Sequence, residues 1–151
     1  MKAQQTLEIC REFTAPIQAV FEAWTQADVL AKWFGPESFT VLNAQTDLSV
    51  GGKYEITIQS PDNNTIKHFG EYVEINEPVS LIFTWELKDQ NCAGSEGQNI
   101  STLVTIQLEQ TTNGTLLTLT HEKLPDQASY AGHQFGWQSS LEALNQYLAS
   151  D

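Results

Sequence analysis

Hydrophobic and polar residues alternate along most of the chain, and this period of two is typical of β-strands that bury one face. In the first such segment, Leu7, Ile9 and Phe13 point to one side, while Glu8 and Glu12 point to the other. Stretches rich in glycine, proline and asparagine separate the segments and indicate turns. The pattern predicts seven strands, at residues 6–13, 39–44, 54–59, 66–75, 79–87, 102–109 and 115–122.

In two parts of the chain the hydrophobic residues recur every three or four positions instead, which is typical of amphipathic helices. Pro16 suits the first turn of a helix, so one short helix is expected at 16–24 and a second directly after it. Gly35 and Pro36 end the second helix. A long helix is predicted over residues 126–148, with hydrophobic positions at Tyr130, Trp137, Leu141, Leu144 and Leu148.

The predicted order is one strand, two short helices, six strands joined by hairpins and a long C-terminal helix, so the expected fold class is α+β. An antiparallel sheet with one apolar face must bury that face against another layer. One helix cannot cover seven flat strands, but a sheet that curves around the helix buries both. The sequence therefore predicts a curved antiparallel seven-stranded sheet around the last helix, with a cavity between the two and the short helices closing one end.

Composition and charge limit the expected partners. A chain of 151 residues with 40% hydrophobic residues is expected to form a single domain, residues 1–151. Seven basic and 19 acidic side chains give a net charge of −12. Such an acidic protein repels phosphate backbones and anionic lipids, which excludes nucleic acid and membrane surfaces as expected partners. No apolar run approaches the roughly 20 residues of a membrane span and no export signal is visible, so we expect a cytoplasmic protein.

Several short motifs together resemble one known family. They follow the family's order from about residue 6 to residue 149: Pro16 to Thr25, Leu30 to Pro36, Gly51-Gly52-Lys53-Tyr54, Gly70 to Ile75, Leu81 to Trp85, Thr115 to His121, and Gly136-Trp137 before Leu141, Leu144 and Leu148. This set resembles the activator of heat-shock protein 90 ATPase homologue-like family of the START-like (SRPBCC, Bet v 1-like) superfamily. The sequence departs from the family at Phe34, where a second tryptophan is common. It also has a longer polar segment at 88–99, which we expect to cover the mouth of the cavity.

The resemblance implies a helix-grip fold with a hydrophobic tunnel between the sheet and the last helix. It implies binding of a small hydrophobic or amphipathic ligand more directly than any reaction, because one fold serves many functions. Strand parity and helical spacing assign candidate ligand-binding residues to the walls of this tunnel. They are Trp33, Phe34, Tyr54, Ile56, Phe69, Phe83, Trp85, Leu117, Leu119, His121, His133 and Trp137.

The histidines and cysteines show no close-spaced metal motif. His68, His121 and His133 lie far apart in the sequence, and Cys10 and Cys92 form no CxxC pair. We therefore expect no metal site and no cofactor, although three remote histidines can still converge in space. Our hypothesis for His121 is a polar anchor that orients a ligand's carbonyl, hydroxyl or carboxylate group, so that His121→Leu weakens binding of polar-headed ligands only.

Two other functions stay open at the level of sequence. A chaperone co-regulator in the manner of the family's namesake would act through its surface. A cyclase-like enzyme for aromatic or polyketide-like substrates would need a general acid or base, for which Tyr54 and His121 are the candidates. No catalytic motif is present, so no catalytic residue is predicted. A homodimer and a monomer are equally consistent with the sequence.

Overall fold

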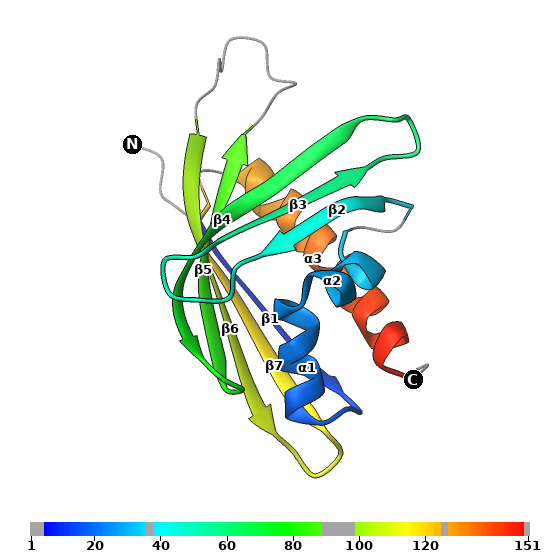
Figure 1. Cartoon of the computed structure of the whole chain (residues 1–151), viewed down its shortest axis with the longest axis vertical. Coiled ribbons are helices and arrows are strands. Elements are labelled where there is room, and N and C mark those ends of the chain that lie inside the picture. The colour runs from blue at the N-terminus through cyan, green and yellow to red at the C-terminus, as the bar shows by residue number, and fades with distance from the viewer. Residues whose placement is uncertain (1–4, 36–37, 89–98, 125–126, 150–151) are drawn as a thin grey trace.

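The protein is built on one curved sheet with a long helix, α3, lying across its inner face (Figure 1). The computed structural model describes residues 5–35, 38–88, 99–124 and 127–149. Its elements are β1 (Gln5–Phe13), α1 (Ile17–Thr25), α2 (Ala27–Trp33), β2 (Thr40–Thr46), β3 (Lys53–Gln59), β4 (Thr65–Asn76), β5 (Ser80–Lys88), β6 (Asn99–Gln110), β7 (Thr115–Leu124) and α3 (Gln127–Ala149).

All neighbouring strands pair antiparallel in the order β1-β7-β6-β5-β4-β3-β2. The predicted element order and the helix-grip fold are therefore confirmed. β1 and β2 form the two edges of the sheet, and β2 carries a register shift between Val41 and Asn43. Most of the segment predicted as a cover, residues 89–98, lies outside the described residues. None of the helices in the described ranges is long and apolar enough to cross a membrane.

The two short helices are defined by local backbone geometry. Pro16 caps α1 in an extended conformation, and its carbonyl accepts a hydrogen bond from Val20 N–H. Gln26 separates α1 from α2 with an extended backbone. The extended backbone of Phe34 ends α2, and the next residue, Gly35, adopts a φ of +101°, a conformation that glycine reaches without strain.

In β4, the residues that face the inside of the sheet are not the ones that the sequence pattern indicated. His68 and Tyr72 point to the inner face, where they pair across the strands with Ile56 and Phe83. Phe69 instead pairs with Glu55 and Glu86 on the outer face, so its predicted place on the inner wall is wrong. The cause is a register shift between Tyr72 and Glu74, which returns Ile75 to the inner side.

Gly70 explains how β4 approaches β5 closely at this point. A Cβ atom on Gly70 would lie 2.0 Å from the carbonyl oxygen of Thr84, so only glycine fits. The same carbonyl accepts a hydrogen bond of 2.5 Å from the Tyr54 hydroxyl. This close approach and the hydrogen bond hold β3, β4 and β5 together at this point.

Candidate functional site

A cavity of about 260 Å³ lies between α3, the β3–β4 hairpin and the chain that follows α2. We call it the outer cleft. Three parts of the fold form its walls: inner-face residues of β3 to β5, the segment after α2, and one face of α3. The lining residues are Phe34, Gly35, Phe39, Ile58, Ile66, His68, Trp85, Gly132, His133, Gly136, Trp137 and Ser140.

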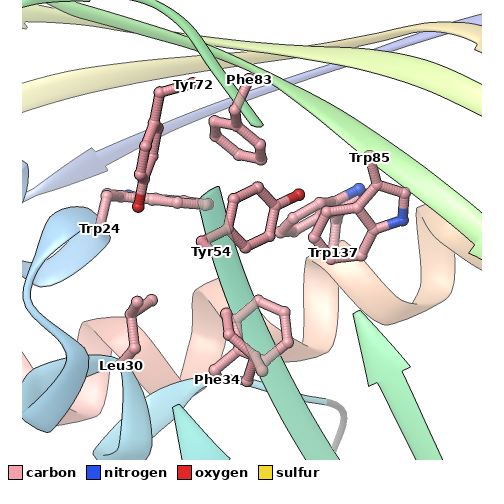
Figure 2. Close-up of a pocket in the computed structure, with 9 residues that line it drawn as sticks. Trp24, Leu30, Phe34, Tyr54, Tyr72, Phe83, Trp85 and Trp137 are labelled. Atoms are coloured by element: carbon pink, nitrogen blue, oxygen red, sulfur yellow. The ribbon is translucent and has the colours of Figure 1, made fainter. Parts of the chain in front are cut away.

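A second, much smaller cavity of about 20 Å³ lies deeper in the core, and we call it the inner pocket. Figure 2 shows the rings of Tyr72 and Phe83 above it, those of Trp85 and Trp137 at the right, and Leu30 and Phe34 below. Its volume is enough for about one water molecule. Phe34, Trp85 and Trp137 line both cavities and therefore form the wall between them.

Trp85 is the centre of an aromatic cluster that forms this wall. Its ring centroid lies 4.9 Å from that of Trp137, 5.9 Å from that of Phe34 and 4.6 Å from that of His68, on which it stacks. Trp137 also contacts Trp24 at 5.8 Å between centroids. The rings of this wall are tilted against one another, with interplanar angles of 49° for Trp85 and Trp137 and 44° for Trp85 and Phe34, and their close packing holds them in place.

A chain of buried hydrogen bonds orients the indole of Trp137 and links it to the backbone of Trp85. The indole N–H of Trp137 donates to Nδ1 of His121 at 3.1 Å. Because an indole nitrogen only donates, Nδ1 is the acceptor, and Nε2 carries the proton of the neutral ring. Nε2 donates to Thr102 Oγ1 at 2.7 Å, and this hydroxyl donates to the carbonyl oxygen of Trp85 at 2.7 Å. His121 is fully buried, so each of these bonds is shielded from water.

All three histidines of the chain converge on this cluster. Trp85 donates its indole N–H to Nε2 of His133 at 3.2 Å, and the rings of His133 and His121 lie 4.8 Å apart. Burial, and to a smaller extent the charge of His133, lowers the pKa of His121 to about 3 and that of His68 to about 4. The site therefore holds both rings in their neutral form at neutral pH.

The converged histidines do not form a metal centre. Both ring nitrogens of His121 are bonded to protein partners, and Nε2 of His133 accepts from Trp85. Within the part of the chain that the structure describes, no group of three or more histidine, cysteine or acidic side chains could hold a metal ion. Cys10 is an exposed free thiol on β1, whereas Cys92 lies outside the described residues.

The structure brings only some of the predicted residues to a cavity. Four of them line the outer cleft: Phe34, Trp85, His133 and Trp137. The inner pocket is lined by Tyr54, Ile56 and Phe83, together with Phe34, Trp85 and Trp137. Four others lie elsewhere in the core: Trp33 donates its indole N–H to the Ala23 carbonyl, and Leu117, Leu119 and His121 are buried on β7. His121 therefore orients Trp137, and neither of its ring nitrogens is left to anchor a ligand.

Several lining residues were missed by the sequence reasoning. The alternation in β4 favoured Phe69, so His68 and Ile66 were not chosen, although their pairing with Ile56 and Ile58 places them on the inner face. Gly132 and Gly136 give no hydrophobic signal, yet both line the cleft, and because they lack side chains they leave space on its α3 side. Their spacing of four, on the same helix face as Ser140, is the signal that could have identified them.

Comparison with known proteins agrees with this fold. The family described as "Activator of Hsp90 ATPase homolog 1-like protein" matches residues 14–149. The AHSA1 protein of Silicibacter pomeroyi is 28% identical, with 96% of this chain and 98% of that one covered and a TM-score of 0.82. A Chromobacterium violaceum protein is 26% identical, with 97% and 98% covered and a TM-score of 0.82. A Rhizobium leguminosarum protein at 23% identity, with 100% and 98% covered and a TM-score of 0.84, shares the fold. No curated protein matches the sequence.

Proposed function

Because the chain belongs to the activator of Hsp90 ATPase homolog 1-like family, whose members include proteins of this fold, we propose that it binds a small, mostly apolar molecule in the outer cleft. The observation that carries the proposal is the cavity of about 260 Å³ between α3 and the β3–β4 hairpin. Binding sites are typically concave and apolar, with a few polar groups that orient the ligand. The outer cleft has this composition.

The volume of the outer cleft indicates the size of the ligand. An apolar cavity of roughly 150 Å³ in a protein core accommodates benzene. The outer cleft is larger, at about 260 Å³, and would accommodate a two-ring compound. The inner pocket, at about 20 Å³, is too small for an organic group. We therefore place the ligand in the outer cleft alone, against the faces of Trp85 and Trp137.

A substitution at Gly132 tests this proposal. A Cβ atom at this position meets no other atom within 4 Å, so a larger side chain has room without disturbing the packing of α3. We expect 1-aminonaphthalene, a neutral two-ring fluorescent probe, to bind the protein with saturable fluorescence enhancement. Gly132→Phe fills the cleft and is expected to weaken probe binding at least tenfold, as measured by fluorescence titration.

Two matched variants separate cleft filling from other effects. Gly132→Ala adds a single methyl group and is expected to retain probe binding, while helix propensity raises the stability by about 0.5–1 kcal/mol. Ala131→Phe places the same large ring on the neighbouring exposed position, which does not line the cleft, and is expected to bind the probe normally. Unchanged affinity in Gly132→Phe, or equal losses in both phenylalanine variants, would refute the proposal.

The family description gives a second candidate function, namely stimulation of the Hsp90 ATPase. A co-regulator of this kind would act through the protein surface. Stimulation of a purified chaperone ATPase that persists in Gly132→Phe, together with no probe binding by the unmodified protein, would favour this function over ligand binding.

The geometry gives less support to a cyclase-like enzyme. The Tyr54 hydroxyl donates to the Thr84 carbonyl, and burial, with smaller effects of Tyr72 and Glu86, raises the Tyr54 pKa well above its ordinary value. His121 has both nitrogens bonded within the core. Either residue would have to break an existing hydrogen bond before transferring a proton.

A further inference from the structure

Three polar side chains, those of His68, His133 and Ser140, line the outer cleft, and the imidazole of His68 contacts both Trp85 and Phe34. Of its polar lining side chains, His133 already accepts from the Trp85 indole. The ring of His68 makes ring contacts with Trp85 and Phe34, and no hydrogen bond to it is formed within the described residues. The ring of His68 is half-buried, so a ligand that displaces water from it loses affinity unless a polar atom of the ligand replaces the lost hydrogen bond.

The position of His68 is fixed by the strands and rings around it. In the sheet, His68 of β4 pairs with the buried Ile56 of β3. Its ring stacks on Trp85 at 4.6 Å and 25°, and meets Phe34 edge-on at 5.6 Å. A ligand ring that lies against Trp85 and Trp137 in the cleft would therefore present its edge near the imidazole.

The charges around the cleft favour an uncharged ligand. None of the described residues that line it is a lysine, arginine, aspartate or glutamate. Burial lowers the His68 pKa to about 4, with a smaller effect from His133, so positive charge is disfavoured there. An anion would meet no cationic partner and a protein of net charge −12. A neutral imidazole offers one N–H donor and one acceptor nitrogen.

From this arrangement we infer that the outer cleft takes an uncharged aromatic molecule that carries a hydroxyl group, and that His68 hydrogen-bonds this hydroxyl while Trp85 and Trp137 contact the ring. A hydroxyl both donates and accepts, so it can pair with either tautomer of His68. The inference rests on the proposed function, because it names the class of ligand for the same cleft.

Three probes of similar size test the inference by isothermal titration calorimetry: naphthalene, 2-naphthol and 2-naphthoate. One net hydrogen bond corresponds to about a three- to tenfold gain in affinity. We expect 2-naphthol to bind three- to tenfold more tightly than naphthalene, and 2-naphthoate to bind more weakly than both. His68→Phe keeps a ring on Trp85 but has no hydrogen-bonding atom, so this variant is expected to bind 2-naphthol and naphthalene with equal affinity.

Naphthalene binding also reports whether the cleft of each variant is intact. His68→Gln, which retains a donor and an acceptor, is expected to keep part of the preference for 2-naphthol. If naphthalene binds but 2-naphthol has no advantage, or if the advantage survives in His68→Phe, the inference fails and the proposed function stands. If none of the three probes binds the unmodified protein, both are overturned.

Discussion

Replacing Trp137 with alanine is expected to lower the free energy of unfolding by about 4 kcal/mol or more. The side chain is 3% exposed and packs against Trp24, Phe34 and Trp85. Truncation of a buried tryptophan to alanine costs about 3–5 kcal/mol. It also leaves Nδ1 of His121 without its donor, which adds part of the roughly 1–3 kcal/mol cost of an unpaired buried group. Urea denaturation measures the change.

Trp137→Phe serves as the matched control. It retains an aromatic ring but not the indole N–H, so we expect an intermediate loss of about 1–3 kcal/mol. This variant also keeps the test decisive if the alanine variant does not fold, since small domains have only about 5–15 kcal/mol of stability. A loss below 1 kcal/mol for the alanine variant would contradict the packing described for the wall between the cavities.

Acidification is the second strong perturbation, and we expect stability to fall by about 4 kcal/mol between pH 7 and pH 5. The folded-state pKa values of His68 and His121, about 4 and about 3, lie below the ordinary value near 6.5. The unfolded chain therefore binds more protons once the pH falls below 6.5. Each group then lowers the stability by about 1.4 kcal/mol per pH unit until its folded pKa is reached. Above pH 6.5 these two groups no longer lower the free energy of unfolding.

Urea unfolding at pH 7, 6 and 5 measures this dependence. The range stops at pH 5 because protonation of carboxylates below it relieves the repulsion in a protein of net charge −12. His68→Phe cannot titrate at that position, and its loss between pH 7 and pH 5 is expected to be about half, or 2 kcal/mol. A stability that stays constant from pH 7 to pH 5 would show that neither imidazole is held neutral by the fold.

The sequence predicted the fold well because its signals were local. Alternation in β3, β5, β6 and β7 indicated the inner faces correctly, and the spacing along α3 placed Trp137 and His133 on the side that faces the sheet. The register shift after Tyr72 is not visible as a composition change, which is why Phe69 was chosen in place of His68.

The alternation of residues along a strand shows which of them face inward, but it does not show which of them line a cavity. Leu117 and Leu119 lie on the inner face of β7, as expected, but α3 packs directly against β1 and β7 and leaves no space there. The cavity opens where the sheet diverges from α3, along β3 and β4. That divergence depends on the tertiary packing of the helix, which no short-range pattern records.

The register shift of β2 affects how the molecule behaves at high concentration. β2 is an edge strand without a single charged residue or proline between Thr40 and Thr46, and Leu42 is 52% exposed. An edge of this composition would readily recruit a strand from another molecule and start aggregation. The bulge at Leu42 interrupts the row of free backbone groups and so guards against such pairing.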